Sequence, residues 1–165
     1  MITLGINYFG QPSSCAIVKN GKLLFAIEEE RLTRIKQDGG FPINSVNECL
    51  KFLKISIKDV DAIGAATLPD RLIKRYLKYT LDNFPKSNSL FLSERAFNRM
   101  KFLNNIENYI REKLNFKKKI FFYNHHLCHI ASSHFLSGFK KSCSVSIDGL
   151  GIHFRGKNSN HWSLI

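Results

Sequence analysis

Three histidines within five residues, His125, His126 and His129, are the side chains of this sequence best suited to metal chemistry. They follow an apolar run, residues 120–123, whose composition predicts a short buried strand. Asn124 is a good helix N-cap because its side-chain oxygen can accept a hydrogen bond from an early backbone N–H. In a helix beginning here, His125 and His129 lie one turn apart on nearly the same face. Their imidazoles could therefore share one metal ion.

The same spacing also occurs in ordinary surface or core histidine pairs, so both interpretations stay open. Two imidazole nitrogens do not complete a catalytic metal site, which usually has a third protein ligand, often a carboxylate. Asp148 follows a strand expected over residues 143–147 and is flanked by flexible backbone. Such a tip can bind Mg²⁺ or let backbone N–H groups approach a phosphate, and it can equally be a plain hairpin turn.

A second candidate region is the charged run EEERLTRIKQDGGFP at residues 28–42. Dense alternating charge usually marks a solvated surface, but here it directly follows an expected buried strand, which favours a pocket. Arg31, Arg34 and Lys36 could hold phosphate or carboxylate groups. Upstream, Ser13 and Ser14 close a turn between two expected strands. Backbone N–H groups of such a turn can face a phosphate, although most turns of this kind are only turns.

The hydrophobic pattern predicts the elements that must position these residues. Helices are expected from residue 44 or 45 to 53, with Asn44 or Ser45 as the cap, and over 70–83, 93–113 and the histidine segment. Asn20-Gly21 predicts a tight hairpin. Strands are expected over residues 2–8, 15–19, 22–27, 62–66, 120–123 and 143–147. This order predicts an α/β fold in which helices flank a mixed sheet.

Length and composition favour one globular domain, because 165 residues with 44% hydrophobic content can bury a core. No apolar run approaches the roughly 18 residues of a membrane span, and the start lacks the pattern of a signal peptide. The four cysteines are scattered without a Cys-x-x-Cys pair, as expected for free thiols in a reducing compartment. We therefore expect a cytoplasmic protein without a membrane segment.

The net charge of +12 is compatible with a basic nucleic-acid-binding module. However, the lysines are spread along the chain and are not gathered with aromatic residues in one stripe. A pocket for a phosphorylated small molecule needs only a few of these basic side chains, whereas a nucleic-acid-binding surface needs many of them together. Nucleic-acid binding is thus kept as an alternative rather than as the main expectation.

Three stretches together resemble the carbamoyltransferases of the nodulation-protein and antibiotic type. They are EEERLTRIKQDGGFP at 28–42, HHLCHIAS at 125–132 and IDGLG at 147–151, in matching order and spacing over residues 2–151. The resemblance implies the first half of an actin-like, sugar-kinase-type (ribonuclease H-like) domain, related to the tRNA threonylcarbamoyl-transfer enzyme. In this family a smaller carboxy-terminal domain makes carbamoyl adenylate from carbamoyl phosphate and ATP. The amino-terminal domain then transfers the carbamoyl group to a hydroxyl of a sugar or natural-product precursor.

The resemblance also implies roles for particular residues. His125 and His129 match the ligands of an iron-type metal, Fe²⁺. The catalytic candidates are Arg31, Lys36 and His126, the last as a neighbour of the ligands. The candidates for binding the adenylate cofactor are Ser13, Ser14, Asp148, Gly149 and Gly151.

The chain departs from the family in two places. The family usually has a His-Asp pair before Ser13, where this chain has Gln11-Pro12. The third metal ligand, much of the nucleotide pocket and the adenylate-forming domain would lie beyond residue 151. Residues 152–165 show no clear period, and we interpret them as a tail produced by a frameshift near codon 151. We therefore expect a carbamoyltransferase fragment that is inactive unless a second chain completes it, or a non-catalytic remnant.

Overall fold

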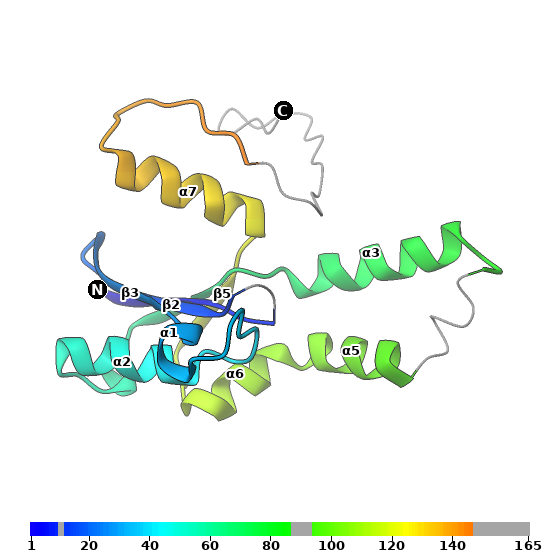
Figure 1. Cartoon of the computed structure of the whole chain (residues 1–165), viewed down its shortest axis with the longest axis horizontal. Helices are drawn as coiled ribbons and strands as arrows, with labels where there is room; N and C mark the ends of the chain where they lie inside the picture. The colour runs from blue at the N-terminus through cyan, green and yellow to red at the C-terminus, as the bar shows by residue number, and fades with distance from the viewer. Residues whose placement is uncertain (10–11, 87–93, 147–165) are drawn as a thin grey trace. The chain divides into compact units, whose positions relative to one another are not determined.

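The computed structural model describes residues 1–9, 12–86 and 94–146 (Figure 1). The chain divides into two compact units, Met1–Phe122 and Tyr123–Ile165, and each is considered separately. The first unit contains a sheet with its helices. The second contains helix α7 (His125–Ser137), which carries the three histidines.

The sheet of the first unit has five strands in the order β3-β2-β1-β4-β5. β1 pairs antiparallel with β2, and β2 with β3, whereas β1 to β4 and β4 to β5 are parallel pairs. The bounds are β1 (Ile2–Asn7), β2 (Ser14–Lys19), β3 (Lys22–Glu28), β4 (Ala62–Ala65) and β5 (Lys119–Phe122). This mixed topology confirms the predicted α/β fold class, a mixed sheet flanked by helices.

The hairpin between β2 and β3 forms at the predicted dipeptide. Asn20 and Gly21 have φ angles of 51° and 78°, the two consecutive positive values of a type I′ turn. Glycine and asparagine tolerate this left-handed conformation, and the turn matches the natural twist of the strands. A bulge follows, because the register shifts between Ile17 and Val18 of β2 and leaves Leu24 without a cross-strand partner.

One face of the sheet packs on helices to form the core. Alternate residues of each strand point to this face, as the period of two in a strand requires. Figure 1 shows α2 and α6 on the same side of the sheet. The helices and the 3-10 turn of this unit are α1 (Glu29–Thr33), α2 (Ile43–Leu53), η1 (Ile57–Asp59), α3 (Pro69–Asp82), α5 (Glu94–Asn104) and α6 (Ile106–Leu114). The fully buried apolar side chains include Leu4, Ile17, Val46, Val60, Ile63 and Ile110.

Two details of the helices differ from the sequence-based prediction. The helix expected over residues 93–113 is broken at Asn105, which serves as the N-cap of α6 and accepts a hydrogen bond from Asn108 Nδ2 at 2.8 Å. Asparagine side chains compete with helical hydrogen bonds, which explains a break at this point. Helix α2 has Pro42 as its N-cap, so the prediction of Asn44 or Ser45 as the cap is wrong.

The strand expected over residues 143–147 is also not observed in its described part. Residues 143–146 have no regular secondary structure and join no strand pair among the described residues. A strand depends on a neighbouring strand for its backbone hydrogen bonds, and alternating hydrophobicity alone does not supply one. Residue 147 lies outside the described part of the chain.

Tyr8 follows β1 and is 4% exposed, yet its hydroxyl finds no hydrogen-bond partner in the described part of the chain. Burial raises the pKa of Tyr8 to about 12, although the neighbouring Thr67 side chain acts in the opposite direction. Tyr8→Phe is expected to leave the free energy of unfolding within about 1 kcal/mol of the wild type, because at most a weak contact with the Thr67 side chain is lost. Urea unfolding followed by far-UV circular dichroism measures this difference.

The same substitution tests the raised pKa of Tyr8. The folded state holds the phenolic proton more tightly than the unfolded state, where the pKa is near 10. The corresponding stability is fully present below about pH 10 and is lost as the pH rises towards 12. Between pH 9 and pH 11 the wild type should therefore lose more stability than Tyr8→Phe. Equal losses would contradict the assignment.

Among the described helices, none combines the length and apolar character that crossing a membrane requires.

Candidate functional site

Helix α7 begins as the sequence predicts, with Asn124 as its N-cap. The Asn124 side-chain oxygen accepts a hydrogen bond from the Leu127 backbone N–H at 3.1 Å, and its carbonyl accepts one from the Cys128 N–H at 3.0 Å. At the other end, Gly138 closes the helix in the left-handed conformation with a φ of 76°. The two caps fix the helix so that residues 125–129 form its first turns.

His125 and His129 meet on one face of α7. Their Nε2 atoms lie 2.9 Å apart, and their ring centroids are 4.4 Å apart with planes crossing at 83°. Two neighbouring nitrogens bound to one octahedral metal at about 2.1 Å lie about 3.0 Å from each other. The pair therefore fits a shared metal ion. The same distance also allows one ring N–H to donate a hydrogen bond to the other ring nitrogen.

The described residues contain no cluster of three or more His, Cys, Asp or Glu side chains that could hold a metal ion. If the histidine pair holds a metal ion, it offers two ligand nitrogens, and the described residues place no third His, Cys, Asp or Glu side chain beside it. Asp148, Gly149 and Gly151, the candidates for the adenylate-facing turn, lie outside the described residues. Their role stays a prediction.

His126 is buried, and its ring meets the His125 ring edge to face with centroids 5.9 Å apart. Its side chain is 6% exposed, and its Nδ1 lies 3.1 Å from the Ser146 hydroxyl. This contact ties the start of α7 to the segment that leads towards residue 148. Burial raises the pKa of the Cys128 thiol on the same turn. His126 is therefore placed to support the first turn of α7 rather than to share the Nε2 pair.

In the first unit, the charged run of residues 28–42 buries one of its carboxylates. Glu29 is 2% exposed, and each of its oxygens accepts two hydrogen bonds. Oε1 accepts from the backbone N–H of Asn44 at 3.1 Å and from its Nδ2 at 2.7 Å. Oε2 accepts from the backbone N–H of Ser45 at 2.8 Å and from its hydroxyl at 2.6 Å. Glu29 thus accepts hydrogen bonds from backbone N–H groups in the first turn of α2, and it links α1 to α2.

Two further acidic residues shape the loop between α1 and α2. Glu30 accepts the backbone N–H of Gln37 at 2.8 Å. Asp38 accepts the Thr33 hydroxyl at 2.9 Å and the backbone N–H of Gly40 at 3.0 Å. These bonds hold the intervening chain in a fixed path, with Gln37 at a φ of 55°.

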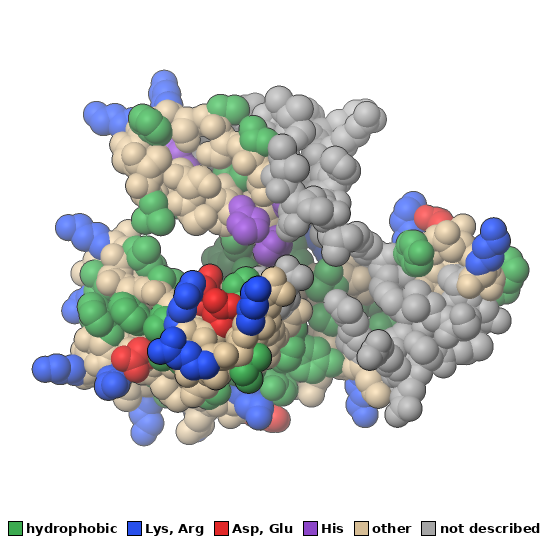
Figure 2. All heavy atoms as spheres, in the orientation of Figure 1, with side chains coloured by type: hydrophobic (Ala, Val, Ile, Leu, Met, Phe, Trp, Pro, Cys, Tyr) green, Lys and Arg blue, Asp and Glu red, His purple; other side chains and the backbone are tan. Residues whose placement is uncertain are grey.

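The basic residues of the run lie on the outside of this loop. The Arg31 side chain is 68% exposed and faces Glu28 at 3.5 Å and Glu30 at 3.8 Å. Arg34 and Lys36 are exposed, and no carboxylate of the described residues forms an ion pair with either. The acidic side chains therefore build the loop, and Arg34 and Lys36 remain available for an anion. Figure 2 shows Lys and Arg side chains grouped around acidic ones over α1 and the loop that follows it.

Ser13 and Ser14 are held by the protein itself. Ser13 is fully buried, its backbone N–H donates to the Asp38 carbonyl at 2.8 Å, and its hydroxyl donates to the Gly40 carbonyl. Ser14 opens β2 and pairs with Asn7 on one side and Glu28 on the other. The turn therefore fastens the loop of Lys36 to the sheet. Phosphate binding by these serines stays a prediction.

A pocket that the sequence did not predict lies in the same unit. Its volume is about 340 Å³, and its walls are mostly apolar. Tyr8 and Thr67 follow the parallel strands β1 and β4, and the carboxyl ends of such strands commonly bind ligands. The lining residues are Tyr8, Phe9, Thr67, Leu72, Phe102 and Leu103. Arg31, Lys36 and this pocket belong to the first unit and the histidine pair to the second, so each group is described within its own unit.

Comparison with known families identifies the class of protein to which this chain belongs. The model of the carbamoyltransferase N-terminus family matches residues 2–158, so the chain belongs to this family. The match extends past Gly151, and the proposed division of the chain at that residue stays a prediction.

Individual relatives are consistent with this assignment. An uncharacterized protein of Synechocystis is 32% identical over 90% of this chain, which covers 25% of that protein. The nodulation protein NolNO of Sinorhizobium fredii is 28% identical over 88% of this chain and is covered to 20%. An uncharacterized protein of Methanocaldococcus jannaschii is 30% identical over 90% of this chain and is covered to 31%. The chain therefore spans between a fifth and a third of the length of these relatives.

Among solved structures, YeaZ from Pseudomonas aeruginosa is 12% identical with a TM-score of 0.42, over 83% of this chain and 49% of that one.

Proposed function

We propose that this chain supplies the metal-holding portion of an O-carbamoyltransferase. The reaction is transfer of a carbamoyl group from carbamoyl phosphate, through carbamoyl adenylate, to a hydroxyl of an acceptor such as a sugar or natural-product precursor. The observation that carries the proposal is the pair of His125 and His129 nitrogens, 2.9 Å apart, in a member of the carbamoyltransferase family.

The residues of this chain have distinct parts in the proposed reaction. His125 and His129 would hold an iron-type divalent metal, which as a Lewis acid would polarise the carbamoyl oxygen. His126, hydrogen-bonded through Ser146, would keep the first turn of α7 in place. Arg31 and Lys36 would attract the phosphate groups of the donor, because an exposed guanidinium and an exposed ammonium both bind such anions.

The chain covers only part of the length of its relatives. It spans at most about a third of the compared relatives, and its described residues supply two metal ligands. We therefore propose that the chain turns over no carbamoyl phosphate alone, and that a further polypeptide segment completes the site.

The first prediction is that purified chain with ATP, Fe²⁺ and carbamoyl phosphate shows no consumption of carbamoyl phosphate above the uncatalysed rate. A chimera in which residues 2–158 replace the matching segment of the Synechocystis relative should recover consumption. His125→Ala in the chimera is the control, which should still consume carbamoyl phosphate to form carbamoyl adenylate but should lose carbamoyl transfer to an acceptor hydroxyl. Turnover by the chain alone would disprove the need for a further segment. A folded chimera that forms carbamoyl adenylate but transfers no carbamoyl group to any acceptor hydroxyl would disprove the carbamoyltransferase role.

A further inference from the structure

Strand β3 forms one border of the sheet in the first unit. The strand order begins with β3, and only β2 pairs with it among the described residues. An outermost strand presents backbone N–H and C=O groups that can pair with another strand. The outer edge of β3 is therefore a possible site of association.

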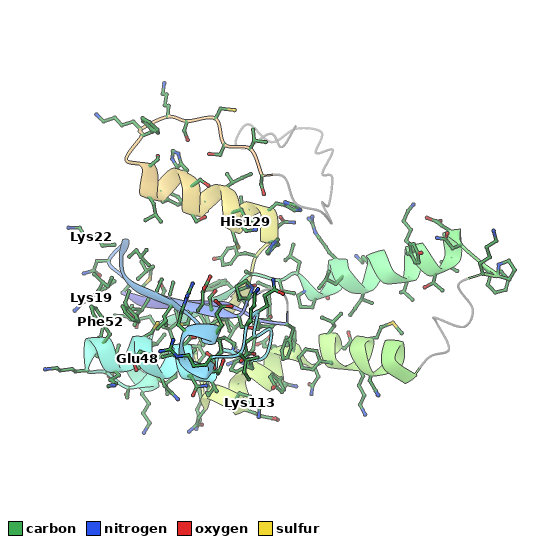
Figure 3. The ribbon with its side chains drawn as sticks, viewed as in Figure 1. Lys19, Lys22, Glu48, Phe52, Lys113 and His129 are labelled. Carbon is green, nitrogen blue, oxygen red and sulfur yellow. The ribbon has the colours of Figure 1, made fainter. Side chains whose placement is uncertain are left out.

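The surface beside this edge is unusually apolar. Leu23 and Leu24 of β3 are 41% and 38% exposed, and Phe52 of α2 is 54% exposed. Phe52 stacks on Phe25 of β3, with ring centroids 4.7 Å apart and planes at 14°. Figure 3 shows Phe52 near Lys19 and Lys22 at one end of this unit, and Figure 2 shows hydrophobic side chains gathered there with basic ones around them.

The sequence of β3, KLLFAIE, is complementary to itself when read in opposite directions. In an antiparallel pair centred on Phe25, Lys22 lies opposite Glu28 of the other copy. Leu23 then faces Ile27, and the pattern is repeated by symmetry on the other side. Cross-strand pairs of opposite charge and of apolar side chains are the pairs that stabilise sheets. We propose that β3 is a dimerisation strand that pairs antiparallel with β3 of a second copy of this chain.

This register also accounts for the exposed ring of Phe52. Directly opposite residues of an antiparallel pair project to the same face of the sheet. The two Phe25 side chains would therefore meet at the symmetry axis, each already stacked on its own Phe52. Aromatic rings packed in this way contribute beyond their buried area. The dimer would have two-fold symmetry, with the same patch used by both copies.

Two features of β3 also occur in strands that avoid pairing. Lys22 stands at the border, and the bulge leaves Leu24 without a partner in β2. Edge lysines and bulges both discourage association. The two interpretations differ in the role of Glu28, which only the dimer places opposite Lys22. In its own chain Glu28 faces the exposed Arg31 at 3.5 Å, an arrangement that leaves it accessible.

A charge exchange tests the proposed pairing. Sedimentation equilibrium of the 165-residue chain should show a concentration-dependent dimer. Lys22→Glu and Glu28→Lys should each raise the dimer dissociation constant by about tenfold, because each substitution creates two like-charged pairs. The double variant restores both pairs with their signs exchanged and should return the constant close to the wild-type value. A misfolded single variant would not be repaired by a second substitution of this kind.

The control is Lys78→Glu on α3, which makes the same change of charge at a lysine that is 79% exposed. It should leave the dissociation constant within about twofold of the wild type. A chain that stays monomeric at all concentrations would overturn the proposal. So would a dimer that Lys22→Glu weakens no more than Lys78→Glu, or one that the double variant fails to restore.

Discussion

Glu29→Gln is expected to lower the free energy of unfolding of the first unit by about 2–4 kcal/mol. The wild-type carboxylate accepts four hydrogen bonds from Asn44 and Ser45 in a position that is 2% exposed. Glutamine keeps one acceptor oxygen, but its N–H₂ group replaces the other one. The two donors that bonded to that oxygen then face another donor and lose their acceptor. The Ser45 hydroxyl can rotate to accept a bond, but a backbone N–H of this helix start cannot. One buried donor is thus left unpaired.

Urea unfolding monitored by far-UV circular dichroism measures this effect as a lower midpoint at an unchanged slope. Glu29→Ala, which leaves all four donors unpaired, should lower the midpoint further than Glu29→Gln. The matched control is Glu48→Gln on α2, whose carboxylate faces Lys51 at 3.5 Å in an exposed ion pair. Glu48→Gln should change the free energy of unfolding by no more than about 0.5 kcal/mol. Equal effects at Glu29 and Glu48 would show that the buried carboxylate does not hold the start of α2.

Glu29 also shows where prediction from the sequence reached its limit. Three glutamates in a row, followed by Arg31, are typical of a solvated surface, and the preceding strand favours only a pocket somewhere along residues 28–42. Nothing local distinguishes the one that is buried, since its partners Asn44 and Ser45 lie fifteen and sixteen residues away. Asn44 and Ser45 were predicted to cap α2 because asparagine and serine are common N-cap residues. Their side chains do serve the helix start, but through a carboxylate that the local pattern cannot supply.

By contrast, local patterns were sufficient where the determining contacts are local. Asn20-Gly21 forms its hairpin and Asn124 caps α7, because each depends on residues within four positions in the chain. The pairing of His125 with His129 follows from helical geometry for the same reason. The mostly apolar pocket lined by Tyr8 and Phe102 could not be predicted in this way. Its walls come from segments nearly one hundred residues apart, and only the folded sheet brings them together.

His129→Ala is expected to weaken Fe²⁺ binding by the chain by at least about tenfold. Even groups that merely orient a metal ligand contribute 10–100-fold to affinity, and His129 would be a ligand itself. Because the described residues supply only the His125 and His129 nitrogens, binding by the wild-type chain should already be weak. Removing one of two ligands also removes the chelate, so His125→Ala should have an effect of similar size.

Anaerobic isothermal titration calorimetry with Fe²⁺ provides the measurement, and His134→Ala provides the control. His134 lies in the same helix and contacts the Ser142 hydroxyl at 2.6 Å, so its loss removes a histidine without touching the pair. Its affinity for Fe²⁺ should remain within about twofold of the wild type. Equal weakening by His134→Ala and His129→Ala would indicate nonspecific binding to histidines and would remove the metal-holding role. A selective loss at His125 and His129 would show that one turn of α7 forms the metal-binding half of a site. The remaining ligand must then come from a segment that approaches this face of the helix.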